Sequence, residues 1–161
     1  MVGGGTLGFG LSHDLDSHVY LINGLTELAL VDAGVGLDLH FGACSVDREL
    51  KDGDVFQMGD CELSVFGTSG HCSGMLSYLM SVEGKTYLFS GDTGFHGGKI
   101  LLINVYDCDW LHYVRSLRKL ASLSFDALLP GHLSLTLNGG RAHVQKAVDC
   151  LDRRVIPPNI L

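Results

Sequence analysis

The sequence predicts a single layered α/β domain, and three observations support that prediction. Short apolar, β-branched segments dominate the first half of the chain, whereas helical patterns and a strand-like segment alternate in the second half. Hydrophobic residues make up 46% of the 161 residues and charged residues 18%, so the chain can bury a core and is not disordered. Glycine occurs 22 times and proline only 3 times, which is typical of an ordered chain with many tight turns.

The first half is expected to form three β-hairpins. The first contains Asn23-Gly24, a dipeptide that favours tight turns between strands. The third turns at Val82-Glu83-Gly84, where glycine permits the backbone to reverse. The paired strands are expected at 19–23 with 28–32, 55–58 with 63–66, and 75–81 with 85–89.

The second half is expected to contain two helices with a short buried strand between them. Apolar residues recur at helical spacing, and the stripe of Trp110, Val114 and Leu117 is expected to face the core. Asp107 or Asp109 could cap this helix. The helices are expected at 110–120 and about 140–154, and the strand at 127–129.

Composition excludes several classes of function. The chain has 11 Lys+Arg against 18 Asp+Glu, a net charge of −7, which argues against nucleic-acid binding. It has no apolar run long enough for a membrane span and no visible signal peptide. Its five cysteines lack CxxC spacing and are expected to be free thiols. We therefore expect a cytoplasmic protein whose partner is a small-molecule substrate.

Three glycine-rich loops each place a possible metal ligand after an apolar segment. They are residues 68–74 with His71, residues 89–94 with Asp92, and residues 128–132 with His132. Glycine beside the ligand lets the backbone turn sharply at the strand end. Two imidazoles and a carboxylate could together hold a divalent metal. The alternative is that each histidine is an ordinary surface residue and that the aspartate forms an Asx turn.

The order of these loops resembles the metallo-β-lactamase superfamily. The segments that match are Val31-Asp32-Ala33-Gly34, Thr68-Ser69-Gly70-His71-Cys72-Ser73-Gly74, Ser90-Gly91-Asp92-Thr93 and Leu129-Pro130-Gly131-His132. The resemblance covers nearly the whole chain. It implies an αββα sandwich with a metal site at one edge, between the two sheets.

The resemblance also implies roles for three residues. His71 would bind a first metal, Asp92 would bridge two metals and so act in catalysis, and His132 would bind the second metal. The implied cofactor is zinc, as one or two ions, with iron or manganese possible. The implied activity is hydrolysis of an ester, thioester, amide or phosphoester bond by water that the metal activates.

One segment departs from the superfamily. Its His-x-His-x-Asp-His signature should lie between Asp32 and Val55, where His40 is the only histidine. A strand–helix unit is therefore expected to be missing near residues 38–45, and the single domain spanning 1–161 to be internally shortened, or truncated. The lost strand could leave an exposed sheet edge and so favour a homodimer.

The sequence leaves three functions open. The first is a metal-dependent hydrolase, and the second is an inactive, shortened member that acts as a binding or assembly module. The third is a mononuclear iron site for oxygen or sulfur chemistry, because two histidines and one carboxylate suit ferrous iron. His40 or Cys72 could approach the metal and His96 could line the cleft, although a surface histidine and a small buried thiol are the commoner roles.

Overall fold

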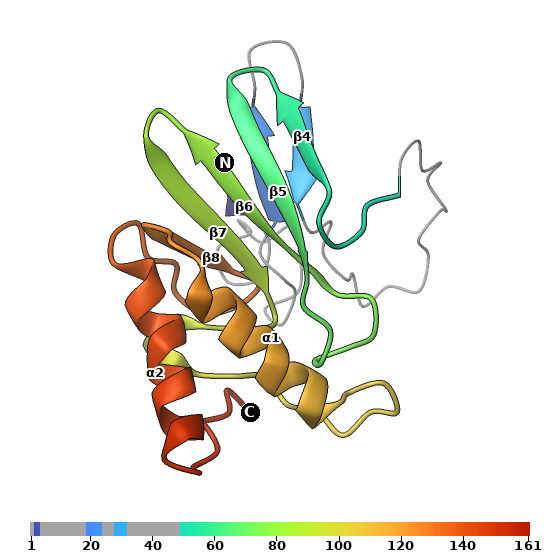
Figure 1. The fold of residues 1–161 in the computed structure, drawn as a ribbon, viewed down its shortest axis with the longest axis vertical. Coiled ribbons are helices and arrows are strands. Elements are labelled where there is room, and N and C mark those ends of the chain that lie inside the picture. Colours follow the sequence, from blue (N-terminus) through green and yellow to red (C-terminus); the bar gives the residue numbers. More distant parts are fainter. Residues whose placement is uncertain (1, 4–18, 24–27, 32–48) are drawn as a thin grey trace.

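The computed structural model describes residues 2–3, 19–23, 28–31 and 49–161, and it arranges their strands in two sheets (Figure 1). The first sheet is antiparallel, in the order β1 (Val2–Gly3), β2 (Val19–Asn23), β3 (Leu28–Val31). The second has five strands, in the order β4 (Val55–Met58), β5 (Cys61–Gly67), β6 (Leu76–Val82), β7 (Lys85–Gly91), β8 (Ala127–Pro130). All three predicted hairpins are present.

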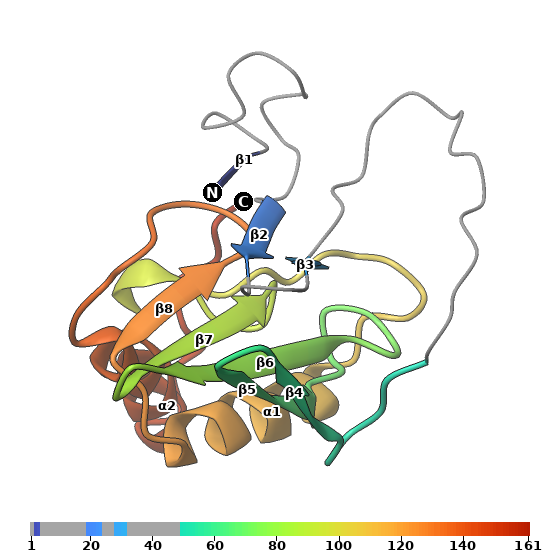
Figure 2. The same ribbon diagram turned by 90° about the horizontal axis from the view of Figure 1, so that it is seen from above.

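Both α-helices lie on one face of the five-stranded sheet, and the three-stranded sheet lies on its other face (Figure 2). The helices are α1 (Trp110–Ser122) and α2 (Gly140–Asp152), and a short 3₁₀ turn, η2, spans His96–Gly98. The predicted mixed α/β class is confirmed. The strand–helix unit expected to be missing near 38–45 falls outside the described residues. Within the part of the chain that the structure describes, no helix is long and apolar enough to span a bilayer.

The direction of the strands decides where the three candidate loops meet. β5 and β7 both pair antiparallel with β6, so they run in the same direction, and β8 pairs parallel with β7. The carboxyl ends of β5, β7 and β8 therefore lie at one end of the sheet. The loops that carry His71, Asp92 and His132 leave the sheet at this end.

The five-stranded sheet is covered on both faces, because successive side chains of a strand point to opposite sides. Leu88 and Leu128 belong to the core formed with the helices. Their neighbours Phe89 and Leu129 belong to a second core together with Tyr20 of β2. Each of these five residues is less than 9% exposed, so β7 and β8 are held between two layers.

Helix α1 buries a face that overlaps the predicted one in part. Leu117 is fully buried as expected, but Trp110 and Val114 are only half-buried. The stripe that faces the sheet is Tyr113, Leu117 and Leu120, each 0% exposed. These residues follow the i, i+4, i+7 spacing of one helix face, three positions further along the chain than the predicted stripe, with Leu117 in common. Asp109, rather than Asp107, caps the helix by accepting a hydrogen bond from the His112 N–H.

Candidate metal centre

The three predicted ligands lie together at the carboxyl ends of β5, β7 and β8. The His71 Nε2 atom is 3.5 Å from Asp92 Oδ2, and His132 Nε2 is 3.4 Å from the same oxygen. Their side chains are between 13% and 21% exposed, so the group is accessible from one side but largely desolvated. Residues separated by 61 positions in the sequence thus share one carboxylate.

The ring of His71 is oriented by a backbone carbonyl. Its Nδ1 lies 3.0 Å from the carbonyl oxygen of Leu101. A carbonyl oxygen can only accept a hydrogen bond, so Nδ1 carries the hydrogen in this arrangement. In the neutral ring the lone pair is then on Nε2, the atom that faces Asp92. Metal-binding histidines in proteins are generally oriented in this way.

Asp92 has one oxygen left without a partner. Oδ2 faces the two imidazoles, whereas Oδ1 is buried and, among the described residues, has no hydrogen-bond partner. A buried carboxylate oxygen without a donor is costly, and a bound cation would remove that cost. The donor set of two imidazoles and a carboxylate fits zinc.

The two loops that hold Asp92 and His132 are joined through their backbones. The Gly131 N–H donates to the Gly91 carbonyl at 2.9 Å, which continues the pairing of β7 and β8 beyond the strands. A Cβ atom at position 131 would stand only 2.4 Å from Asp92 Oδ1. Position 131 therefore has room for glycine alone while Asp92 keeps this conformation.

The arrangement is one carboxylate between two histidines. Among the described residues, no group of three or more His, Cys, Asp or Glu side chains is arranged so that it could hold a metal ion. The assignment of His71, Asp92 and His132 as metal ligands remains a prediction.

The other candidates from the sequence do not join the group of His71, Asp92 and His132. His40 is outside the described residues, and His96 is exposed and stacks on His143 with ring centroids 4.1 Å apart. Cys72 is half-buried beside His71, and burial, followed by the charges of Asp107 and Asp92, raises the pKa of its thiol. A thiol with a raised pKa is a poorer metal ligand and nucleophile.

Sequence reasoning missed two residues that shape the centre. Leu101 acts through its backbone carbonyl, for which a side-chain pattern gives no signal. Tyr113 donates from its hydroxyl to the backbone carbonyl of Asp92 at 2.6 Å. Its signal was present, because a tyrosine in the same helical stripe as Leu117 and Leu120 brings a polar group into the core.

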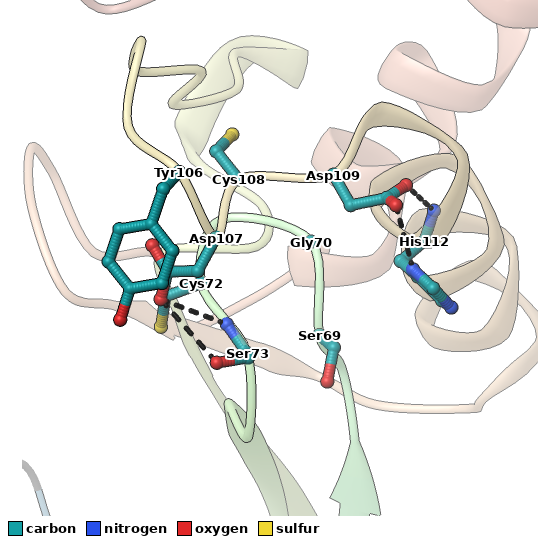
Figure 3. A pocket seen from close by; sticks show the side chains of 9 residues that line it. All are labelled: Ser69, Gly70, Cys72, Ser73, Tyr106, Asp107, Cys108, Asp109 and His112. Atoms are coloured by element: carbon teal, nitrogen blue, oxygen red, sulfur yellow. Dashed lines mark hydrogen bonds and ion pairs between the residues drawn. The ribbon is translucent and has the colours of Figure 1, made fainter.

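A pocket opens between the loop after β5 and the start of α1 (Figure 3). Its volume is about 360 Å³, and it is lined by Ser69, Gly70, Cys72, Ser73, Tyr106, Asp107, Cys108, Asp109 and His112. Asp107 crosses the pocket to accept hydrogen bonds from the N–H and hydroxyl of Ser73, at 3.4 and 3.5 Å. Gly70 and Cys72, the sequence neighbours of His71, line the pocket.

Comparison with known families identifies the class. The sequence model of the metallo-beta-lactamase superfamily matches residues 44–132, which is more than half of the chain. The matched segment contains all three candidate ligands and the strands that position them. The chain belongs to the metallo-beta-lactamase superfamily.

Similar curated proteins are described as hydroxyacylglutathione hydrolases. The chain is 43% identical over 54 residues to that of Buchnera aphidicola subsp. Schizaphis graminum, which covers 34% of the chain and 20% of the relative. It is 36% identical over 88 residues to that of Brucella anthropi, which covers 54% of the chain and 32% of the relative. The chain thus spans about a fifth to a third of the length of these relatives.

Solved structures show the same fold. A metallo-β-lactamase from Cronobacter sakazakii, described as having a HARLDQ motif, aligns with a TM-score of 0.53 at 22% identity, covering 74% of this chain and 54% of that one. A subclass B3 metallo-β-lactamase of Bradyrhizobium japonicum aligns with a TM-score of 0.50 at 23% identity, covering 73% and 53%. At this identity the likeness concerns the fold alone.

Proposed function

We propose that this protein is a metal-dependent hydrolase whose metal ligands are His71, Asp92 and His132. The observation that supports it most is the convergence of two imidazole Nε2 atoms on one carboxylate oxygen, at 3.5 and 3.4 Å. Imidazole and carboxylate are the ligands of catalytic zinc sites, and zinc is the proposed ion. The unpartnered Oδ1 of Asp92 supplies a further acceptor.

Each residue has a defined part in this proposal. His71 and His132 present Nε2 lone pairs, and the Leu101 carbonyl holds the ring of His71 in the required orientation. Asp92 provides the negative charge that a divalent cation needs in a largely desolvated position. A bound ion would polarise the scissile carbonyl and lower the pKa of the attacking water.

A thioester is the substrate class that the comparisons favour. The relatives of 36–43% identity are described as hydroxyacylglutathione hydrolases, which act on such a bond. The pocket of about 360 Å³, which is lined by Gly70 and Cys72 on either side of His71 in the sequence, is the proposed place for the substrate. Hydrolysis of an ester, an amide or a phosphoester is the alternative within the same chemistry.

Metal analysis combined with a thioesterase assay tests the proposal. The purified protein should retain zinc and hydrolyse a hydroxyacyl thioester. His71→Ala and Asp92→Ala should each lose most of the metal and the activity, whereas His143→Ala, on α2, should keep both. Absence of zinc binding together with absence of hydrolysis of all four bond types would refute the proposal. Iron in place of zinc after anaerobic purification would favour a mononuclear iron centre.

A binding or assembly module is the second candidate. Two observations favour it: the interval between Asp32 and Val55 contains no His-x-His-x-Asp-His sequence, and no described group of three ligands is arranged to hold an ion. This candidate predicts that a chelator leaves the melting temperature unchanged. A large fall in melting temperature on adding EDTA, or any zinc-dependent turnover, would exclude it.

A further inference from the structure

A buried chain of hydrogen bonds joins Asp92 to His71 through helix α1. The Tyr113 hydroxyl donates to the Asp92 carbonyl oxygen at 2.6 Å and accepts from the Leu101 N–H at 3.0 Å. The Leu101 carbonyl, in turn, is the group that orients His71 at 3.0 Å. Tyr113 is 0% exposed, so water cannot replace either bond. The Tyr113 hydroxyl therefore holds the backbone of Asp92 and also the backbone of Leu101, whose carbonyl orients His71.

The same face of α1 holds the loop that precedes His71. The Asp109 N–H donates to the Gly70 carbonyl at 2.8 Å, and the Ser116 hydroxyl donates to the Ser69 carbonyl at 2.7 Å. Gly70 lies directly against the backbone of Tyr113, where a Cβ would stand 2.4 Å from Tyr113 Cα. Residues 109, 113 and 116 follow the spacing of one helix face.

We propose that Tyr113 is the positioning residue of the metal centre, because it sets the backbone of Asp92 and, through Leu101, the ring of His71. This inference rests on the proposed function for its role in metal binding. The geometric part of the inference depends only on the three hydrogen bonds described above.

The tyrosine hydroxyl is suited to this task because it donates and accepts at once. Burial raises the pKa of Tyr113 far above its ordinary value, so the hydroxyl keeps its hydrogen throughout the working pH range. A phenylalanine would preserve the ring and its packing but would leave the Asp92 carbonyl and the Leu101 N–H without this partner. Both groups would then seek other partners, and the Leu101 carbonyl would no longer be held opposite His71.

Zinc affinity measured by competition with a chromogenic chelator tests the inference. Tyr113→Phe should bind zinc about ten-fold more weakly than the unmodified protein, the loss typical of a removed outer partner of a metal ligand. Leu120→Val is the matched control, because it lies about two turns further along α1 in the helix core and lowers stability without removing a polar contact. It should keep the original zinc affinity. Unchanged affinity in Tyr113→Phe would overturn the inference.

A second measurement needs no metal and separates the two proposals. The ¹⁵N shifts of the His71 ring report which nitrogen carries the hydrogen, and the unmodified metal-free protein should show it on Nδ1. Tyr113→Phe should lose this preference, whereas Leu120→Val should retain it. If the protein binds no zinc at all, the proposed function fails, and the ¹⁵N shifts of His71 in Tyr113→Phe then test the positioning role separately. Loss of the Nδ1 preference in this variant supports that role, and retention overturns it.

Discussion

The hydroxyl of Tyr20, on β2, donates a 2.5 Å hydrogen bond to the carbonyl oxygen of Pro130, at the end of β8. Tyr20 is 5% exposed, and its ring meets Phe89 edge-on with centroids 5.3 Å apart. Pro130 stands two residues before His132. The three-stranded sheet therefore contacts the loop of one candidate ligand, as α1 contacts the loops of the other two.

Tyr20→Phe should lower the free energy of unfolding by about 1–2 kcal/mol, because it removes a buried hydrogen bond between the two sheets. Urea denaturation followed by circular dichroism measures this change. Tyr106→Phe is the matched control, since Tyr106 is fully exposed, and it should alter stability by less than about 0.5 kcal/mol. Equal stability of the two variants would contradict the importance of the contact between Tyr20 and Pro130.

Gly70→Ala should destabilise the fold by more than about 3 kcal/mol, since it combines a clash with backbone strain. The new Cβ would stand 2.4 and 2.5 Å from backbone atoms of Tyr113, and φ at Gly70 is +144°. Gly74→Ala, in the same loop, shares a positive φ of +75° but meets nothing within 4 Å. It should cost only about 1–2 kcal/mol. Similar losses in thermal melts would show that the contact with Tyr113 does not matter.

Gly131→Ala should weaken zinc binding at least about ten-fold, because its Cβ would displace the Asp92 carboxylate. The atom it meets, Oδ1, is the end of a side chain that can rotate away, so the metal-free protein should lose little stability. The checks are chelator competition for zinc and a thermal melt in EDTA. Zinc affinity equal to that of the unmodified protein would mean that Asp92 is not a ligand in the conformation described.

Stability should fall as the pH drops below about 6.5, and His143 should contribute to this fall. Burial, followed by the nearby charges of His96 and Lys146, lowers the pKa of His143 from its ordinary value of 6.5. Its Nδ1 accepts a 2.9 Å hydrogen bond from the Gly97 N–H, which requires that nitrogen to carry no hydrogen. The unfolded chain therefore takes up the proton first, so the contribution is complete above pH 6.5 and is lost below it.

The variant His143→Asn isolates this effect, because its amide oxygen can accept from Gly97 without titrating. Urea denaturation between pH 5 and 8 should show a smaller pH dependence for the variant than for the unmodified protein. Identical pH profiles would show that His143 has the same proton affinity in the folded and unfolded chains.

Local patterns accounted for most of the fold. The hairpins follow from short apolar segments separated by turn residues, and both are properties of neighbours in the sequence. The two-residue turn between β6 and β7, with φ of 48° at Glu83 and 74° at Gly84, is an example. The buried stripe of α1 was predicted three residues too early, because Trp110 and Leu111 are both apolar, whereas Trp110 packs only partly against the core and Leu111 is 66% exposed. Sequence periodicity alone could not separate two adjacent stripes.

The three side chains of the candidate site could be predicted from the sequence, whereas the groups that hold them in place could not. His71, Asp92 and His132 each stand beside glycine after a strand, and the strand directions bring them together. The Leu101 carbonyl and the two tyrosine hydroxyls of Tyr20 and Tyr113 act over long stretches of sequence, and their partners are backbone atoms. Every residue has the same backbone groups, so the sequence does not indicate which of them accept these hydrogen bonds. Only the folded structure shows these partners.

The parallel course of β5, β7 and β8 also determines which parts of the protein can be altered freely. The turns at Gly59-Asp60 and Glu83-Gly84 begin β5 and β7, and so they lie at the opposite end of the sheet from the three candidate ligands. Glu83 and Gly84 are exposed. A fluorophore, a tether or a short inserted peptide attached there would report on the protein from a distance and leave the end with the three candidate ligands unchanged.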